Sequence, residues 1–238
     1  MSAATLVLGL ACVTVGATVQ ATIGFGAALV SVPLLLLVDP RFVPGPIAVA
    51  GLAVNVTMAV TQRAHADWPG VRWLAIGLVP GVAVAGLALA AVSGPSLALL
   101  SAAAILVAVA ISAADRRPPR GRWTLLGAGF FSGYMGTSAG IGGPPLALCY
   151  QDAPPRTLRA TFAVVFLLTA PLTLATLRVT GHLDASALRA GVALVPGGLL
   201  GFALSRPLAG RLADRQVRPV VLAFAALSAA AVIIRVAI

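Results

Sequence analysis

The sequence is short of charge. Charged residues make up 9% of the 238 residues, lysine and glutamate do not occur, and all 16 basic residues are arginine. A soluble domain usually carries about 25% charged residues. Hydrophobic residues reach 60% and the mean hydropathy is +1.03. This composition excludes an ordinary soluble domain and predicts an integral membrane protein embedded in a lipid bilayer.

Cysteine and nucleotide-binding motifs are also scarce. Cys12 and Cys149 both lie in apolar runs, so we expect neither a disulfide nor a metal site. Without a P-loop, ATP-driven transport by this chain alone is excluded. The net charge of +10 comes from arginines in short loops, which leaves no basic face for nucleic acid. No cofactor is implied, and we expect no cleaved signal peptide because no basic residues precede the first apolar stretch.

The sequence repeats itself at an offset of 116 to 117 residues. Three motifs occur in both halves in the same order. They pair residues 65–67 (His-Ala-Asp) with 182–184 (His-Leu-Asp), 24–26 (Gly-Phe-Gly) with 140–142 (Gly-Ile-Gly), and 78–81 with 194–197 (both Leu-Val-Pro-Gly). Such agreement indicates two copies of one unit. A duplicated apolar chain with glycine-broken segments is typical of a secondary transporter.

The expected fold is an all-α polytopic membrane protein built from two inverted repeats. Each repeat combines a glycine-broken re-entrant hairpin, or a long broken helix, with three transmembrane helices of roughly 20 residues. The first repeat, 1–115, has its hairpin at 5–38 and its helices at 42–62, 73–92 and 97–114. The second, 116–238, has its hairpin at 123–150 and its helices at 160–177, 190–205 and 219–236.

The arginines favour the hairpins over eight full crossings. Eight crossings would place nine arginines on one side of the membrane and seven on the other. Hairpins at 5–38 and 123–150 change the division to twelve and four. Because positive loops gather in the cytoplasm, the hairpin topology is preferred, with both termini outside the cytoplasm.

Residues 20–26 and 133–145 are the unusual stretches of the two repeats. The second contains Gly142-Gly143-Pro144-Pro145, and glycine and proline cost a helix about 1 and 3 kcal/mol respectively. Broken backbone at membrane depth is tolerated where it is buried in protein or lines a wet cavity. Helix N-termini that follow the breaks would bring partial positive charge to the membrane centre, which suits an anion. Pro144 or Pro145 fits the first position of such a helix.

We expect a substrate site where the two breaks meet near the membrane centre. The predicted substrate-binding residues are Gln20, Thr22, Gly24, Gly26, Asn55, Thr137, Ser138, Gly140, Gly142 and Gly143. Gln20 and Asn55 stand out because buried amides are costly without partners. Other hydroxyls able to line the site are Ser31, Thr57, Ser132, Tyr134 and Thr169. The alternative is that small residues at 129/133, 136/140 and 197/201 simply allow close helix packing.

The repeated His-x-Asp motif has a structural and a chemical interpretation. Asp67 and Asp184 are expected to cap the helices that follow them. Proton transfer or other transport chemistry at His65 and His182 is the alternative. No carboxylate lies inside a predicted span, so proton coupling would run through a histidine or on the substrate itself.

These residues resemble the TauE/SafE sulfite exporter family over nearly the whole chain. The resemblance rests on residues 23–26 (Ile-Gly-Phe-Gly), 33–37 (Pro-Leu-Leu-Leu-Leu), 65–68 (His-Ala-Asp-Trp), 140–144 (Gly-Ile-Gly-Gly-Pro) and 181–184 (Gly-His-Leu-Asp). It departs from the family's pattern at Ala64, where glycine is usual, at Ala27-Ala28, and at Pro145. The resemblance implies transport of small sulfur-containing or organic anions across the bacterial inner membrane.

The predicted function is therefore secondary transport of a small anion by alternating access, without enzymatic activity. A passive anion channel of the same fold and a non-transporting partner subunit remain alternatives. A membrane-embedded enzyme is disfavoured because no cluster of His, Asp or Glu lies within the spans. The glycine-lined faces would also allow a homodimer.

Overall fold

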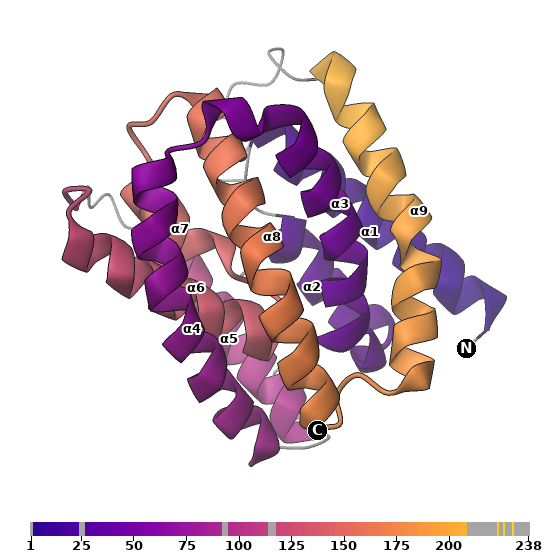
Figure 1. Cartoon of the computed structure of the whole chain (residues 1–238). Coiled ribbons are helices and arrows are strands. Elements are labelled where there is room, and N and C mark those ends of the chain that lie inside the picture. Colours follow the sequence, from indigo (N-terminus) through magenta and orange to yellow (C-terminus); the bar gives the residue numbers. More distant parts are fainter. Residues whose placement is uncertain are drawn as a thin grey trace.

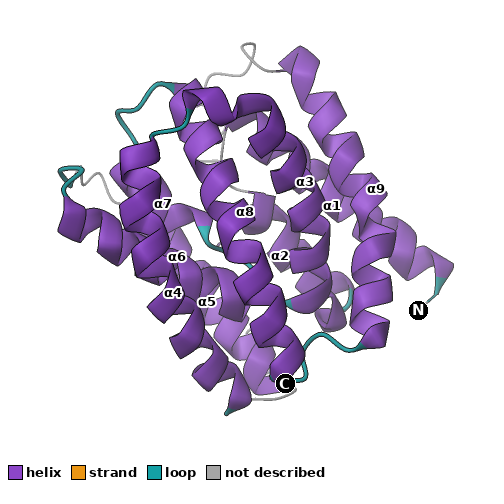
Figure 2. Ribbon diagram, viewed as in Figure 1, coloured by secondary structure: helices purple, strands orange, loops and turns teal. Residues whose placement is uncertain are grey.

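The computed structural model describes residues 2–23, 27–91, 95–113 and 118–208, with the single residues 223, 226 and 230. These residues form an all-helical bundle (Figures 1 and 2). Its α-helices are α1 (Ala3–Ile23), α2 (Ala27–Val38), α3 (Gly45–Gln62), α4 (Trp68–Ala90), α5 (Pro95–Ala113), α6 (Arg122–Ala139), α7 (Gly143–Cys149), α8 (Pro155–Val179) and α9 (Ala185–Leu208). Two 3₁₀ turns, η1 (Pro40–Phe42) and η2 (Arg63–His65), lie on either side of α3.

Five of the described helices, α1, α3, α4, α8 and α9, are long and apolar enough to cross a membrane. The helices expected at 42–62, 73–92, 97–114, 160–177 and 190–205 all form, with ends shifted by up to about five residues. The largest shifts occur at the starts of α4, α8 and α9, where a capping aspartate or a proline marks the first helical residue. The charge-free runs of the sequence do not reveal these starts. The helix expected at 219–236 lies outside the described residues, apart from 223, 226 and 230.

The aspartates of the repeated motif cap helices, as expected. Asp67 precedes α4, and its Oδ1 accepts a hydrogen bond from Gly70 N at 3.2 Å. Asp184 precedes α9, and its Oδ1 accepts from Ala187 N at 2.6 Å. Each carboxylate satisfies one N–H group that the first turn of a helix leaves unpaired. The capping interpretation is confirmed.

Both expected hairpins consist of two helices that fold back on each other. In the first, Ser31 Oγ of α2 donates to Cys12 O of α1 at 3.0 Å, and Phe42 lies against Gly9. In the second, α6 ends at Ala139 and α7 turns back so that Gly142 lies beside Ser132. Gly24 and Gly26, predicted at the first break, lie outside the described residues.

Two pairs of neighbouring helices run parallel to each other. Thr14 and Thr18 of α1 donate to the carbonyls of Gly197 and Gly201 of α9, both at 3.1 Å, so these helices are parallel. In α4, Gly77 and Gly81 face the carbonyls of Leu126 and Phe130 in the same order, so α4 and α6 are parallel too.

Helix α3 runs antiparallel to α8, its counterpart at the repeat offset (Figure 1). The start of α3 at Gly45 lies against the carbonyl of His182, just after the end of α8. Asp67, just after the end of α3, donates from its backbone N to Thr161 Oγ1 near the start of α8 at 3.0 Å.

We name two groups of helices after the glycine-mediated pairs α1–α9 and α4–α6, and α3 and α8 also pack extensively against each other. The first group is α1, α2, α3 and α9, and the second is α4, α6, α7 and α8. Each group contains helices from both halves of the sequence, and α3 faces α8 across the boundary between them. Helix α5 packs against α2 of the first group and against α6 and α7 of the second.

The described arginines gather at one end of the bundle, where α3 ends and α4, α6 and α8 begin. We call this the arginine-rich end; it carries Arg63, Arg72, Arg120, Arg122, Arg156, Arg159 and Arg206. The opposite end carries Arg41, Arg178 and Arg189. The α6–α7 hairpin opens at the arginine-rich end, and the α1–α2 hairpin opens at the opposite end.

Glycines let the paired helices touch backbone to backbone. A Cβ at Gly129 or Gly133 of α6 would strike the carbonyl oxygens of Leu74 and Leu78 in α4. A Cβ at Gly201 of α9 would strike the carbonyl oxygen of Thr14. The close-packing interpretation is confirmed for Gly129, Gly133, Gly197 and Gly201, because small residues permit such approach between apolar helices. At Gly136 and Gly140 a Cβ would strike no carbonyl of another helix.

We therefore expect Gly129→Ala to lower stability by about 1–3 kcal/mol, the usual cost of overpacking. Thermal unfolding of the purified protein in detergent measures the change. Gly127→Ala on the same helix is the matched control, because a Cβ there meets nothing within 4 Å. Equal midpoints for the two variants would contradict the packing argument.

Candidate functional site

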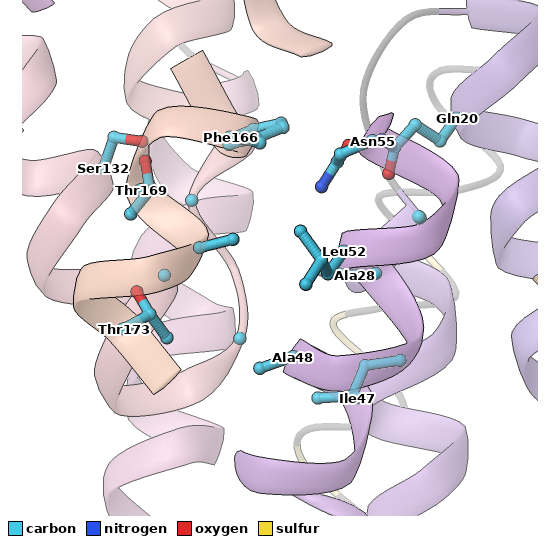
Figure 3. Close-up of a pocket in the computed structure, with 17 residues that line it drawn as sticks. Gln20, Ala28, Ile47, Ala48, Leu52, Asn55, Ser132, Phe166, Thr169 and Thr173 are labelled. Carbon is cyan, nitrogen blue, oxygen red and sulfur yellow. The ribbon is translucent and has the colours of Figure 1, made fainter. Parts of the chain in front are cut away.

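A cavity of about 140 Å³ lies between α3 and α8, at the level where α6 breaks before α7 (Figure 3). Helices from both halves of the sequence line it. Its polar side chains are Gln20, Asn55, Ser132, Thr169 and Thr173. Glycines at 51, 136, 140, 142 and 143 leave the space open. A cavity of about 150 Å³ holds a molecule the size of benzene, so this cavity has room for a small molecule.

Gln20 and Asn55 form the polar wall on the α1–α3 side. Gln20 Nε2 donates to Asn55 Oδ1 at 3.0 Å and lies 3.9 Å from Met58 Sδ. This bond holds the two amides in one arrangement. Figure 3 shows the Asn55 amide nitrogen directed into the space between α3 and α8. The pair therefore presents an N–H donor to the cavity.

Hydroxyl groups form the polar wall on the α6–α8 side. Thr169 Oγ1 donates to Val165 O at 2.7 Å, and Thr173 shares a hydrogen bond with Thr137 at 2.8 Å. Ser132 is buried and also lines the cavity. This wall offers hydroxyl groups but no charge.

The break between α6 and α7 is built by glycine and proline. Gly140 ends α6 with a φ of 76°, in the left-handed region that side chains avoid. Its N–H reaches the carbonyl of Gly136, and Ile141 N donates to Met135 O at 3.1 Å. Helix α7 then starts at Gly143, followed by Pro144. A Cβ at Gly142 would meet Ser132 Oγ at 3.1 Å and the Phe166 ring at 3.2 Å.

The structure brings five of the predicted site residues together around the cavity. They are Gln20, Asn55, Gly140, Gly142 and Gly143. Thr137 is one hydrogen bond behind the wall, through Thr173. Their role in binding stays a prediction.

Thr22 and Ser138 do not line the cavity. Each hydroxyl donates to a carbonyl one turn earlier in its own helix, Thr22 to Thr18 O at 2.7 Å and Ser138 to Tyr134 O at 2.8 Å. Hydroxyls satisfied in this way need no other partner. Gly24 and Gly26 lie outside the described residues.

Sequence reasoning missed Thr173, Phe166 and Gly51, and it offered only a packing role for Gly136; all four line the cavity. On α8, the cavity-lining residues 166, 169 and 173 follow helical spacing and therefore share one face. A similar stripe runs along α3 at residues 48, 52 and 55. Both helices are apolar on their other faces too, so the pattern does not reveal which stripe faces inward.

A second polar cluster lies at the arginine-rich end. The hydroxyl of Tyr150, a fully buried residue just after α7, donates to Asp67 Oδ2 at 2.8 Å. The Tyr150 ring packs edge-on against Phe162 at 6.0 Å, and Phe162 packs against Phe166 at 6.0 Å. This row of aromatic rings connects the Asp67 cap to the cavity wall.

The remaining titratable groups lie away from the cavity. His65 and His182 occupy the two helix-connecting turns at opposite ends of the bundle, and His182 Nδ1 pairs with Thr180 Oγ1 at 3.1 Å. In the η1 turn, a hydrogen bond from Arg41 lowers the pKa of Asp39. Among the described residues, no group of three or more His, Cys, Asp or Glu could hold a metal ion.

Comparison with known proteins adds the family context. A family model described as "Sulfite exporter TauE/SafE" matches residues 8–232. A protein of Cupriavidus necator described as "Probable sulfite/organosulfonate exporter TauE" is 27% identical over 202 residues, which cover 80% of this chain and 79% of that protein. No solved structure matches the chain significantly.

We expect Tyr150→Phe to destabilise the protein by about 1–3 kcal/mol, because Asp67 loses a partner while the aromatic packing remains. Thermal unfolding in detergent measures the loss. Tyr134→Phe is the control, since no described residue bonds to the Tyr134 hydroxyl. In an Asp67→Asn background the cost of Tyr150→Phe should shrink. An undiminished cost would place its cause outside the Tyr150–Asp67 bond.

Proposed function

Because the chain belongs to the TauE/SafE sulfite exporter family, we propose that it exports sulfite or a small organosulfonate across the bacterial inner membrane. The family consists of membrane transporters and not of enzymes. The observation that carries the proposal is the uncharged polar cavity at the broken α6–α7 hairpin. In this proposal the substrate occupies that cavity, and alternating access opens it to each end in turn.

Neutral donors bind the anion in this proposal. The Asn55 amide and the Ser132 hydroxyl face the cavity from opposite walls. Helix α2, twelve residues long, begins there with Ala27, and the first N–H groups of a helix lack partners within it. Helix α7 has seven residues, so its dipole contributes less. Its glycines matter mainly for the space that they leave.

Two inverted repeats account for the arrangement. Residues offset by 116 positions line the same cavity in two cases, Gln20 with Gly136 and Ala27 with Gly143. The antiparallel course of α3 and α8 and the equivalent pairs α1–α9 and α6–α4 support an inverted relationship. Each hairpin then re-enters from its own side of the membrane.

The arginine-rich end faces the cytoplasm in this proposal. The described arginines divide seven to three between the ends of the bundle, as the positive-inside rule favours. Full crossings at 5–38 and 123–150 would have put Arg156, Arg159 and Arg206 with Arg41 instead.

A coupled proton would move on the substrate rather than through a histidine. Neither His65 nor His182 lines the cavity, and the described lining contains no ionisable side chain. Proton carriers within membrane proteins are usually carboxylates or histidines at membrane depth. This part of the proposal follows because neither histidine lines the cavity.

Flux in proteoliposomes tests the proposed function. We expect saturable sulfite or sulfonate flux that is accelerated by substrate on the opposite side. Flux that neither saturates nor shows such exchange would identify a passive anion channel. Absence of flux for sulfite, sulfonates, thiosulfate and carboxylates would refute transport by this chain alone and favour a partner subunit.

Cysteine labelling tests the orientation. In spheroplasts, Ala64→Cys should resist an impermeant thiol reagent, and Ser186→Cys should react, because these exposed positions lie at opposite ends of the bundle. The native Cys12 and Cys149 are buried and provide the background. Labelling of both introduced cysteines from one side would contradict the topology.

Gly51→Leu should stop flux and leave the fold intact. Gly51 lines the cavity, and a Cβ there meets nothing within 4 Å, so the new side chain fills the space without a clash. Gly127→Leu, also in open surroundings but away from the cavity, is the matched control. Full flux in Gly51→Leu, with unchanged thermal stability in both variants, would rule out this cavity as the transport site.

A further inference from the structure

Two arginine–tryptophan pairs lie at the starts of α4 and α6, away from the cavity. Arg72 Cζ lies 5.5 Å from the centre of the Trp73 ring, and Arg122 Cζ lies 4.9 Å from the centre of the Trp123 ring. Both arginines are exposed, and Trp123 is 71% exposed. A cation–π contact orders a guanidinium without giving its N–H groups an acceptor oxygen. Each pair therefore holds a positioned donor that can bind an anion.

The packing of α4 on α6 brings the two pairs together. A Cβ at Gly77 would strike the carbonyl oxygen of Leu126, 49 residues further along the chain, and the same spacing recurs one turn later, at residues 81 and 130. Because the two helices are parallel, this register continued one turn earlier sets Trp73 opposite Arg122. Helices that touch through glycine are closer than the usual distance of about 8–10 Å between axes. Both guanidinium groups can therefore reach one ligand.

The two pairs lie at the edge of a surface that is suited to lipid. Val84 follows Trp73 by eleven residues, about three helical turns, and so lies on the same face of α4. On α6, Phe131 follows Trp123 by eight residues, about two turns. Both are exposed apolar side chains, of the kind that contacts acyl chains in a membrane protein. Tryptophan is enriched at the level of the lipid headgroups, which places the two guanidinium groups at the depth of the phosphates.

The charge of this surface is positive. In the sequence, residues 115–122, which lead into α6, contain four arginines and one aspartate. Asp67, the acidic residue before α4, accepts hydrogen bonds from Gly70 N and from the Tyr150 hydroxyl. Guanidinium groups bind phosphate through two N–H groups at once, which favours them over other cations as phosphate ligands.

We propose that Arg72 and Arg122, positioned by Trp73 and Trp123, bind the phosphate of one anionic phospholipid at the α4–α6 seam. The acyl chains of that lipid then lie along the exposed apolar faces of α4 and α6. This site is separate from the transport cavity and goes beyond the proposed function. It selects lipids by charge, because a zwitterionic headgroup brings its own cation to the phosphate.

A general excess of positive charge at this end of the bundle is the competing explanation, because any arginine near a membrane surface attracts anionic lipid. A matched pair of arginines separates the two. Arg63 and Arg156 are exposed at the same end but belong to η2 and α8. Replacing both with glutamine removes as much charge as replacing Arg72 and Arg122 and leaves the α4–α6 seam unchanged.

Quenching of tryptophan fluorescence by brominated lipids measures binding at this place. The chain has three tryptophans, and a Trp68→Phe background leaves Trp73 and Trp123 as reporters. The protein is reconstituted in phosphatidylcholine bilayers, and brominated phosphatidylglycerol or brominated phosphatidylcholine is titrated in. At low salt we expect phosphatidylglycerol to bind about tenfold more strongly than phosphatidylcholine. This preference should shrink at about 1 M salt, where the Debye length is about 3 Å.

The variants should differ in this preference. Arg72→Gln combined with Arg122→Gln should bring the ratio of the two binding constants close to one, and each single substitution should lower the ratio about threefold. Arg63→Gln combined with Arg156→Gln should leave it near tenfold. Monodisperse size-exclusion profiles show that each variant is folded before its lipid binding is compared.

Three results would overturn the proposal. The first is a ratio near one in the starting protein, and the second is a preference that survives Arg72→Gln with Arg122→Gln or falls equally in both double variants. The third is loss of the preference when inorganic phosphate is added at constant ionic strength, which would identify a site for a free anion instead of a lipid. The assay measures no flux, so its outcome is independent of the proposed transport function.

Discussion

Every peptide group inside a bilayer needs a partner within the protein, because hydrocarbon supplies none. This constraint governs where the chain can interrupt a helix. At the α6–α7 break, the N–H groups of Gly140 and Ile141 return to the carbonyls of Gly136 and Met135, and Pro144 and Pro145 have no N–H to lose. Surrounding helices cover what remains. The interruption is therefore confined to the interior, where it also opens the cavity.

Close glycine contacts hold two pairs of long helices together. Helix α4 lies against α6 and α1 against α9, with backbone carbonyls facing glycines at Gly81, Gly129 and Gly201. The cavity instead lies where α3 faces α8. Relative movement of α3 and α8 would therefore change access to the cavity without separating these glycine contacts.

The repeat offset predicts corresponding breaks in the two halves because duplication constrains distant parts of a chain together. The arginine distribution favours hairpins at 5–38 and 123–150, and the helix pairs α1–α2 and α6–α7 lie in these two stretches. The inverted relationship itself stays a prediction. Side-chain directions were harder to foresee. Thr22 and Ser138 have the right chemistry, but each bonds to its own helix. Thr173 lines the cavity because of how α8 is rotated against α3, and rotation is set by tertiary packing that an all-round apolar helix does not encode locally.

A hydrogen bond joins α8 to α1 at the arginine-rich end, where Arg159 Nη1 donates to the Thr22 carbonyl at 3.0 Å. Gln20–Asn55 joins α1 to α3, and Thr137–Thr173 joins α6 to α8. In the proposed cycle, opening at the arginine-rich end separates α1 from α8 and breaks the bond to Thr22. A substrate that binds the open state more tightly would favour that state, which is the differential interaction that any ligand-driven conformational change requires.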